Sequence, residues 1–282
     1  MEKLETIVEK VLDLLERYEF IVAKGTDGFV SADEISEDEK IKATLLGRRV
    51  AELYVDPLTA HHLIKRIRRS TEKEMSAFGI LQMITNTLEM RPLLRVKTKE
   101  YDDVMKQLNK YEHLIFQKEP SIYDQDYDEF LSSVKTAVFM NDWIEEKDEE
   151  FLLSQYDVRP GETRYKIDRA DWLLYCCEEL VKIMHLSDIG KEISKIRVRL
   201  KYGVKEELLT LLRLKGVGRV RARKLYQNGI KDIGGVKKAD LGKLGVILGK
   251  KLAADVKNQV GIEVLTPIAQ TKRKGQMSLR KY

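Results

Sequence analysis

The sequence has few of the residues from which catalytic and metal sites are built. Its 282 residues include two cysteines and four histidines. Because Cys176 and Cys177 are adjacent, they cannot form an ordinary disulfide framework or a Cys-x-x-Cys metal knuckle, and we expect them to pack on a helix in a reducing compartment. The histidines show no His-Glu-x-x-His spacing and have no cysteine partners. The sequence therefore predicts no metal site.

Long apolar runs and nucleotide-binding loops are also missing. No apolar stretch approaches the roughly 20 residues that span a bilayer, and no signal peptide precedes the first predicted helix, so we expect a cytoplasmic protein without membrane contact. Residues 245–251 (GVILGKK) come nearest to a Walker loop, but they lack one residue between the glycines and a Ser or Thr at the end. The chain is therefore not expected to hydrolyse ATP.

One acidic cluster offers a catalytic alternative. Four carboxylates fall between Asp124 and Glu129, and a nuclease could use such a cluster to hold Mg²⁺ for phosphodiester hydrolysis. The simpler interpretation is an acidic helix start, because Asp and Glu stabilise the first turn of a helix. Solvated charge runs greatly outnumber catalytic ones, which favours the simpler interpretation.

Charge is abundant and unevenly distributed. Residues 191–282 hold 24 Lys and Arg against 7 Asp and Glu, a net charge of +17, whereas the first 190 residues carry a net charge of −12. A surface rich in Lys and Glu, as in thermophiles, explains the high total charge but not this segregation. A basic block beside an acidic one indicates a polyanion-binding end on a solvated scaffold.

Helical spacing of apolar residues dominates the chain and predicts a mainly α fold. A helix over 2–20, a loop with Gly25 and Gly28, and a return strand over 40–44 together resemble the end of a winged-helix domain, so the chain is expected to begin part-way through one. Asp56-Pro57 is a good helix start. Further helices are predicted over 74–88, 100–115, 126–146, 162–184 and 191–201.

The most informative stretch is residues 208–230. A predicted apolar helix runs into Gly216-Val217-Gly218, and a second helix opens at once. Glycine permits positive φ and close backbone approach, and a helix N-terminus presents unpaired N–H groups to an anion. This combination predicts a helix-hairpin-helix that holds a nucleic-acid backbone without reading bases. The predicted contacts are Lys215, Gly216, Val217, Gly218, Arg219, Arg221, Arg223 and Lys224.

Two further interpretations concern this hairpin. A glycine-containing helix–helix turn with a merely solvated basic face is the alternative to DNA binding. Residues 241–252 half repeat the motif, with Gly245 where Gly216 stands in the first unit. We interpret them as a second, degenerate hairpin packed against the first.

A tryptophan on the helix that follows Pro160 is a second candidate contact. Arg169 lies three residues before Trp172 and Arg164 eight before, so these side chains can share a face. An aromatic ring with flanking cations can stack on a base and hold the adjoining phosphates of a single strand. Burial of Trp172 in a helical core is the alternative, and periodicity alone favours it.

Three segments match one known family in the right order: residues 46–60 (LGRRVAELYVDPLTA), 141–146 (NDWIEE) and 218–226 (GRVRARKLY). They resemble the C-terminal half of the archaeal superfamily-two DNA repair helicases, the "308" helicases related to the HELQ and polymerase-theta helicase regions. The resemblance extends over nearly the whole chain. It implies a partial winged helix over 1–55, a helical ratchet domain over 56–200, a helix-hairpin-helix domain over 201–265 and a basic tail over 266–282.

The resemblance also implies roles for single residues. Trp172 matches the family's ratchet tryptophan, which the translocating strand contacts. The basic partner two turns earlier is not matched, because Tyr165 stands there between Arg164 and Lys166. The implied ratchet contacts are therefore Arg164, Lys166, Arg169 and Trp172. The hairpin residues match the family's contact with DNA at the exit side.

Function and partners follow as expectations. The resemblance implies a portion of an ATP-dependent 3′–5′ helicase that guides single-stranded or forked DNA, with ATP and Mg belonging to motor domains whose motifs this chain lacks. Those motor domains and a single-strand-binding protein are expected partners. Gln276, Leu279 and Tyr282 partly match a sliding-clamp peptide, although chance spacing also explains them. A different class, a regulator whose acidic helical region binds a replication protein, remains the alternative.

Overall fold

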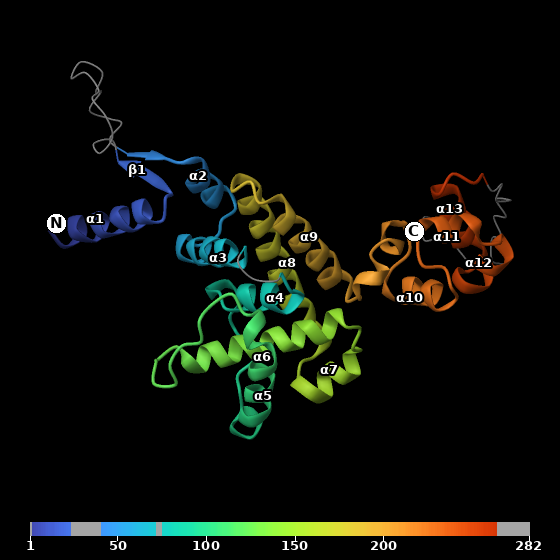
Figure 1. Ribbon diagram of the computed structural model, residues 1–282, viewed down its shortest axis with the longest axis horizontal. Coiled ribbons are helices and arrows are strands. Elements are labelled where there is room, and N and C mark those ends of the chain that lie inside the picture. Colours follow the sequence, from blue (N-terminus) through green and yellow to red (C-terminus); the bar gives the residue numbers. More distant parts are fainter. Residues whose placement is uncertain (1, 24–40, 72–74, 264–282) are drawn as a thin grey trace, which may run out of the picture. The chain divides into compact units, whose positions relative to one another are not determined.

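The computed structural model describes residues 2–23, 41–71 and 75–263 of the chain, which divides into two compact units, Met1–Lys205 and Glu206–Tyr282. Helices make up most of both units, and the described residues hold one two-stranded sheet (Figure 1). The predicted mainly α fold is confirmed. We refer to the two parts as unit 1 and unit 2.

Unit 1 begins with a helix and a short antiparallel hairpin. Strand β1 (Ile21–Ala23) pairs with β2 (Ile41–Ala43). Helix α2 (Leu45–Glu52) follows, and the Thr44 hydroxyl caps it by accepting a hydrogen bond from the Gly47 amide. A side chain at Gly47 would meet the Phe20 carbonyl, so this position admits only glycine.

Helix α1 (Glu2–Arg17) is amphipathic, as its sequence predicts, yet its apolar side chains are exposed. Leu4 is 66% exposed and Ile7 58% exposed, and Val8 and Val11 are also open. Among the described side chains of α1, Leu15 near its C-terminal end packs on the hydrophobic core. Within the ranges that the structure describes, no element covers the apolar stripe of α1.

Long helices build the core of unit 1. Helix α4 (Ala77–Thr85) packs against α6 (Tyr127–Ile144), and α8 (Pro160–Ile183) packs along α9 (Ser187–Tyr202) (Figure 1). All but the first residue of α4 are buried. The other helices of this unit are α3 (Pro57–Ser70), η2 (Leu88–Met90), η3 (Thr98–Glu100), α5 (Tyr101–Tyr111), η4 (Glu112–Leu114) and α7 (Glu149–Tyr156).

The two cysteines lie within this core on α8, as the sequence predicts. Both thiols are free and buried. Burial raises the pKa of Cys176 to about 12, and it raises the pKa of Cys177 as well. Because the thiolate is the reactive form, these cysteines act as small apolar side chains that fill the core.

Unit 2 is a smaller helical bundle. Its elements are η5 (Glu206–Leu208), η6 (Leu211–Arg213), α10 (Arg219–Gln227), α11 (Ile233–Lys238), α12 (Leu241–Leu248) and α13 (Lys250–Gln259). The segment before Gly216 consists of two short 3₁₀ turns, not the α-helix that we predicted. Four of its five leucines are buried and anchor the turns to the bundle core, namely Leu208, Leu211, Leu212 and Leu214.

A second hairpin follows the first, but its register differs from the predicted one. Gly245 lies inside α12, and the turn glycine between α12 and α13 is Gly249, with φ +87°. Helix α12 packs against both α13 and α10. The alignment of Gly245 with Gly216 was wrong because only Gly249 has the positive φ that a tight turn demands.

Candidate nucleic-acid interface

The first hairpin turn of unit 2 depends on its glycines. Gly216 has a φ of +84°, and a Cβ there would lie 2.7 Å from Cδ1 of Leu252 on α13. The next residue, Val217, is buried, and Gly218 then caps α10. The turn is thus pressed onto α13, and its backbone can reach the surface without a side chain in front of it.

A glutamine on α13 fixes the same turn from the other side. The Gln259 amide oxygen accepts a hydrogen bond from the Lys215 N–H at 2.7 Å, and its NH₂ group donates to the Lys215 carbonyl at 3.2 Å. These two bonds satisfy both backbone groups of Lys215 and leave its side chain exposed. Sequence reasoning missed Gln259, because it lies 44 residues from its partner.

Four of the five predicted basic residues of the hairpin fall into two groups, and the fifth, Arg219, is half-buried at the first position of α10. Arg221 donates to the Gly216 carbonyl at 2.8 Å, and Arg223 is half-buried against Glu207 at 2.9 Å. These two arginines therefore hold the hairpin together. Lys215 and Lys224 are exposed, and neither side chain has a partner within the described part of the chain.

The caps of the four helices in unit 2 also differ. Asp232 and Asp240 cap α11 and α12 with their carboxylates, which accept first-turn amide hydrogen bonds. Helices α10 and α13 have glycine caps, which offer no side-chain acceptor, and both helices begin with basic residues. Uncapped amides and nearby cations favour an anion at these two N-termini.

The turn geometry predicts a graded cost for adding a methyl group. Gly229 has a φ of +81° with open space around it, whereas Gly216 has a similar φ of +84° and the Leu252 contact. We expect Gly229→Ala to lower the free energy of unfolding by about 1 kcal/mol, and Gly216→Ala by about 1 kcal/mol more. Urea unfolding measures the free energy of each variant, and amide hydrogen exchange shows whether the loss is centred on α10. Equal losses in the two variants would contradict the close packing of Gly216 against Leu252.

On α8, two of the predicted contacts share an exposed face with a tyrosine. Arg169 lies over the Tyr165 ring, 5.4 Å from its centroid, and Tyr165 is 45% exposed. Arg164 is exposed and paired with Asp168. Trp172 lies one turn further along, partly buried against the core. We call Tyr165, Arg169 and Trp172 the α8 stripe.

Lys166 lies elsewhere. Its side chain is buried, and its ammonium group donates to the Pro92 carbonyl at 2.6 Å. Burial holds the pKa of Lys166 below its ordinary value. This lysine faces the segment 91–97 and lies apart from the α8 stripe, so we do not include it in the proposed interface. The helical spacing of the sequence could have indicated this burial, because Lys166 lies on the same side of α8 as the buried residues Thr163 and Ala170.

The second tryptophan of the chain is structural. The Trp143 indole N–H donates to the Leu200 carbonyl at 2.7 Å, which ties α6 to α9. Its ring is partly buried against the hydrophobic core. Trp143 therefore supports the bundle and provides a matched control for Trp172.

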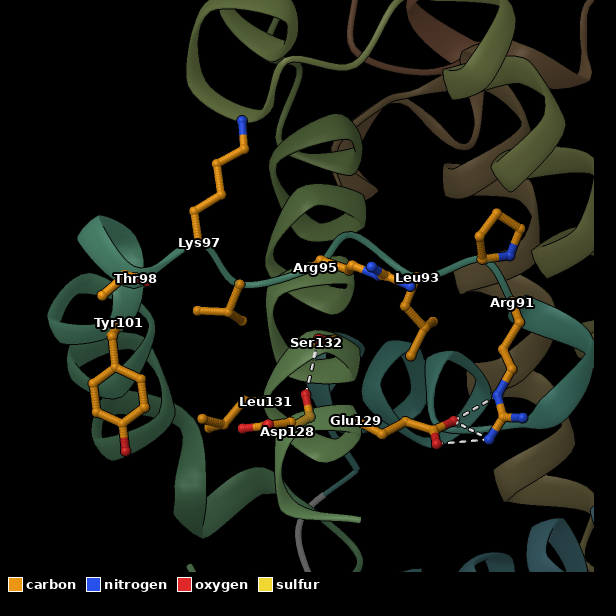
Figure 2. A pocket seen from close by; sticks show the side chains of 12 residues that line it. Arg91, Leu93, Arg95, Lys97, Thr98, Tyr101, Asp128, Glu129, Leu131 and Ser132 are labelled. Atoms are coloured by element: carbon orange, nitrogen blue, oxygen red, sulfur yellow. Dashed lines mark hydrogen bonds and ion pairs between the residues drawn. The ribbon is translucent and has the colours of Figure 1, made fainter. Parts of the chain in front are cut away.

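Two of the four acidic residues considered for a nuclease, Asp124 and Glu129, are engaged in other contacts. Figure 2 shows Glu129 facing Arg91, which donates to it through two bonds of 2.6 Å. Asp124 accepts from the Ser121 amide at 2.8 Å. The cavity of Figure 2, about 930 Å³, contains Asp128 and Glu129 as its carboxylates. Within the ranges that the structure describes, no group of three potential ligands can hold a metal ion.

The predicted clamp-binding residues Gln276, Leu279 and Tyr282 lie outside the described residues, as does the whole of the predicted tail from 266 onward. That interpretation therefore stays a prediction. No helix of the described ranges is long and apolar enough to cross a membrane.

Comparison with known proteins identifies the helical core of unit 1. Residues 78–203 match the family described as archaeal helicase, domain 4. The α8 stripe and Trp143 both lie within the domain 4 match, and the resemblance expected from the sequence motifs is confirmed.

Relatives of the whole chain are helicases. The ATP-dependent DNA helicase Hel308 of Methanococcus vannielii is 34% identical over 257 residues, 80% of this chain and 33% of that protein. Hel308 of Caldivirga maquilingensis is 32% identical, covering 90% of this chain and 33% of that protein. Hel308 of Pyrococcus horikoshii is 32% identical, and the match covers 95% of this chain and 39% of that protein. The chain thus spans between a third and two fifths of the length of these relatives.

Proposed function

We propose that this chain is the DNA-guiding portion of an ATP-dependent 3′–5′ DNA helicase. It binds single-stranded and forked DNA through backbone contacts of the unit 2 hairpin and through stacking on the α8 stripe. The observation that carries the proposal is the hairpin turn, where α10 begins without a side-chain cap just after Lys215. Lys215, like Lys224 further along α10, is exposed and has no side-chain partner among the described residues. Its relatives are named as DNA helicases, and ATP and Mg²⁺ would act in the motor of such a protein.

The α8 stripe supports the same function in a different way. A base can stack on the exposed side of an aromatic ring, and a guanidinium held beside it can contact the adjoining phosphate. Tyr165 and Arg169 already form such a stacked pair. Together with Trp172 they provide two aromatic platforms with a cation between them on consecutive turns of one helix.

The two cations of α8 are expected to behave differently. Arg169→Gln removes one phosphate contact, which at 0.1 M salt is expected to weaken single-strand binding about fivefold. Lys166→Met should leave the affinity unchanged, because that ammonium group is buried against Pro92. Fluorescence anisotropy of a labelled oligothymidylate measures both, and equal losses in the two variants would contradict the assignment.

An alternative function is a regulator that acts through protein contacts. The exposed apolar stripe of α1 favours this alternative, because an uncovered amphipathic helix commonly packs on a partner. Anisotropy with a labelled single strand and with a forked duplex separates the two functions. The helicase proposal requires tight binding that weakens steeply as salt rises, and a chain that bound neither DNA would act by protein contact alone.

A further inference from the structure

A cationic cavity in unit 1 lies apart from the α8 stripe. It measures about 410 Å³ and lies between α3, the region from the end of α4 through η2, and the segment before α6. We call it the α3 pocket. Five Lys and Arg residues line it against two carboxylates, and those cations are Lys65, Arg66, Arg69, Arg91 and Lys118.

Three of these cations are exposed and have no partner among the described residues. Lys65 and Arg69 stand four residues apart on α3, so they share one face, and Lys118 comes from the segment that follows η4. No hydrogen bond or ion pair involves these three side chains within the described residues. Arg68, which precedes Arg69 on α3, differs from these three cations because it forms an ion pair with Glu19 at 2.8 Å.

Arg66 is fixed in the wall of the pocket. Its Nη1 donates to the carbonyls of Met83 and Asn86, at 3.1 and 3.4 Å. Burial, with a contribution from nearby Arg69, lowers the pKa of Arg66 to about 10. The Nε and Nη2 donors have no partner in the described ranges. A desolvated guanidinium beside other cations raises the free energy of the empty pocket, and a bound anion would lower it.

The carboxylates of the pocket do not neutralise these cations. Glu129 is bound by Arg91 through two hydrogen bonds of 2.6 Å. Asp126 is the other carboxylate, at the start of α6. His62 also lines the pocket, and burial and Arg66 lower its pKa. The pocket therefore keeps a net positive charge at neutral pH.

We propose that the α3 pocket binds a phosphate group of a DNA backbone, as a contact separate from the α8 stripe and the hairpin. Arginine donors and lysine charges from several directions suit a tetrahedral anion. Phe130 is the one Phe, Tyr or Trp among the residues that line the pocket, and it is buried. Cationic donors therefore make the contact, which reads no sequence. The choice of DNA rests on the proposed function, whereas the affinity for phosphate rests on the pocket alone.

The first test compares two triple variants of the full chain. Lys65→Gln, Arg69→Gln and Lys118→Gln together remove the unpartnered cations. Lys106→Gln, Lys182→Gln and Lys191→Gln remove three exposed lysines of unit 1 that form surface ion pairs. With a forked duplex at 0.1 M salt we expect the pocket variant to bind about eightfold more weakly than the control, with a salt slope smaller by about 1. Equal affinities overturn the proposal.

The second test separates DNA from free phosphate and uses inorganic pyrophosphate as the probe. We expect pyrophosphate to raise the melting temperature of the unmodified chain and of the control, but not of the pocket variant. A pyrophosphate effect with unchanged fork binding would assign the pocket to free phosphate and overturn the DNA contact. If neither the unmodified chain nor either variant bound DNA, the proposed function would fail. An equal pyrophosphate shift of the melting temperature in all three proteins would contradict phosphate binding in the α3 pocket.

Discussion

Replacing Lys215 and Lys224 together by glutamine is expected to weaken single-strand binding about 25-fold at 0.1 M salt. Each phosphate contact contributes about 0.7 to the salt slope with single strands, which corresponds to about fivefold per contact at this salt concentration. Lys215 precedes the glycine-capped start of α10 and Lys224 lies in the last turn of that helix. Both side chains are exposed, and neither has a hydrogen bond or ion pair within the described residues. Anisotropy titrations at several salt concentrations measure the affinity and the slope.

A matched pair of lysines controls for net charge. Lys237 and Lys238 are exposed at the end of α11 in the same unit, and their replacement by glutamine removes the same charge. The DNA affinity of this control should fall by no more than about threefold, because it loses only long-range electrostatic attraction. The hairpin assignment would be contradicted by equal losses in the two double variants, which would indicate a diffuse basic surface.

Trp172→Ala is expected to weaken binding of an oligothymidylate about tenfold. A base stacked on an aromatic side chain is worth roughly 1–3 kcal/mol by alanine substitution, and the partial burial of Trp172 places the expected effect in the lower half of that range. Trp172→Phe should restore much of the affinity, because phenylalanine keeps a stacking face. The same anisotropy assay measures both variants.

Trp143 provides the control that separates stacking from stability. Trp143→Phe loses the hydrogen bond to the Leu200 carbonyl, so it should lower the free energy of unfolding by about 1–3 kcal/mol. It should leave DNA affinity unchanged. If Trp172→Ala instead destabilised the fold and left the affinity intact, Trp172 would be the core residue that periodicity alone favours.

Helices with a clear apolar period could be predicted well from the sequence. The predicted helix over 126–146 is α6, and the predicted start at Asp56-Pro57 is that of α3, where the Asp56 carboxylate accepts from the Leu58 amide. The 3₁₀ turns before Gly216 were not predicted. Leucines three residues apart suit a 3₁₀ turn as well as an α-helix, and only packing against the rest of unit 2 decides between them.

Site residues were harder to predict than helices, because their roles depend on distant partners. The sequence identifies a basic hairpin, but it cannot show that Arg223 faces Glu207 while Lys224 faces solvent. Lys166 was grouped with its neighbours although its carbonyl partner lies 74 residues away. The α3 pocket could not be predicted from the sequence for the same reason, because Lys118 comes close to the α3 cations only in the folded chain.

The most direct test uses the fluorescence of Trp172 in the Trp143→Phe variant, where it is the only tryptophan. If a DNA strand stacks on the α8 stripe, titration with an unlabelled oligothymidylate should quench this emission, with a midpoint equal to the Kd from anisotropy. Raising the salt concentration should reverse both signals together. Emission that stayed constant while anisotropy reported binding would contradict the account, because the strand would then be held without contact to α8.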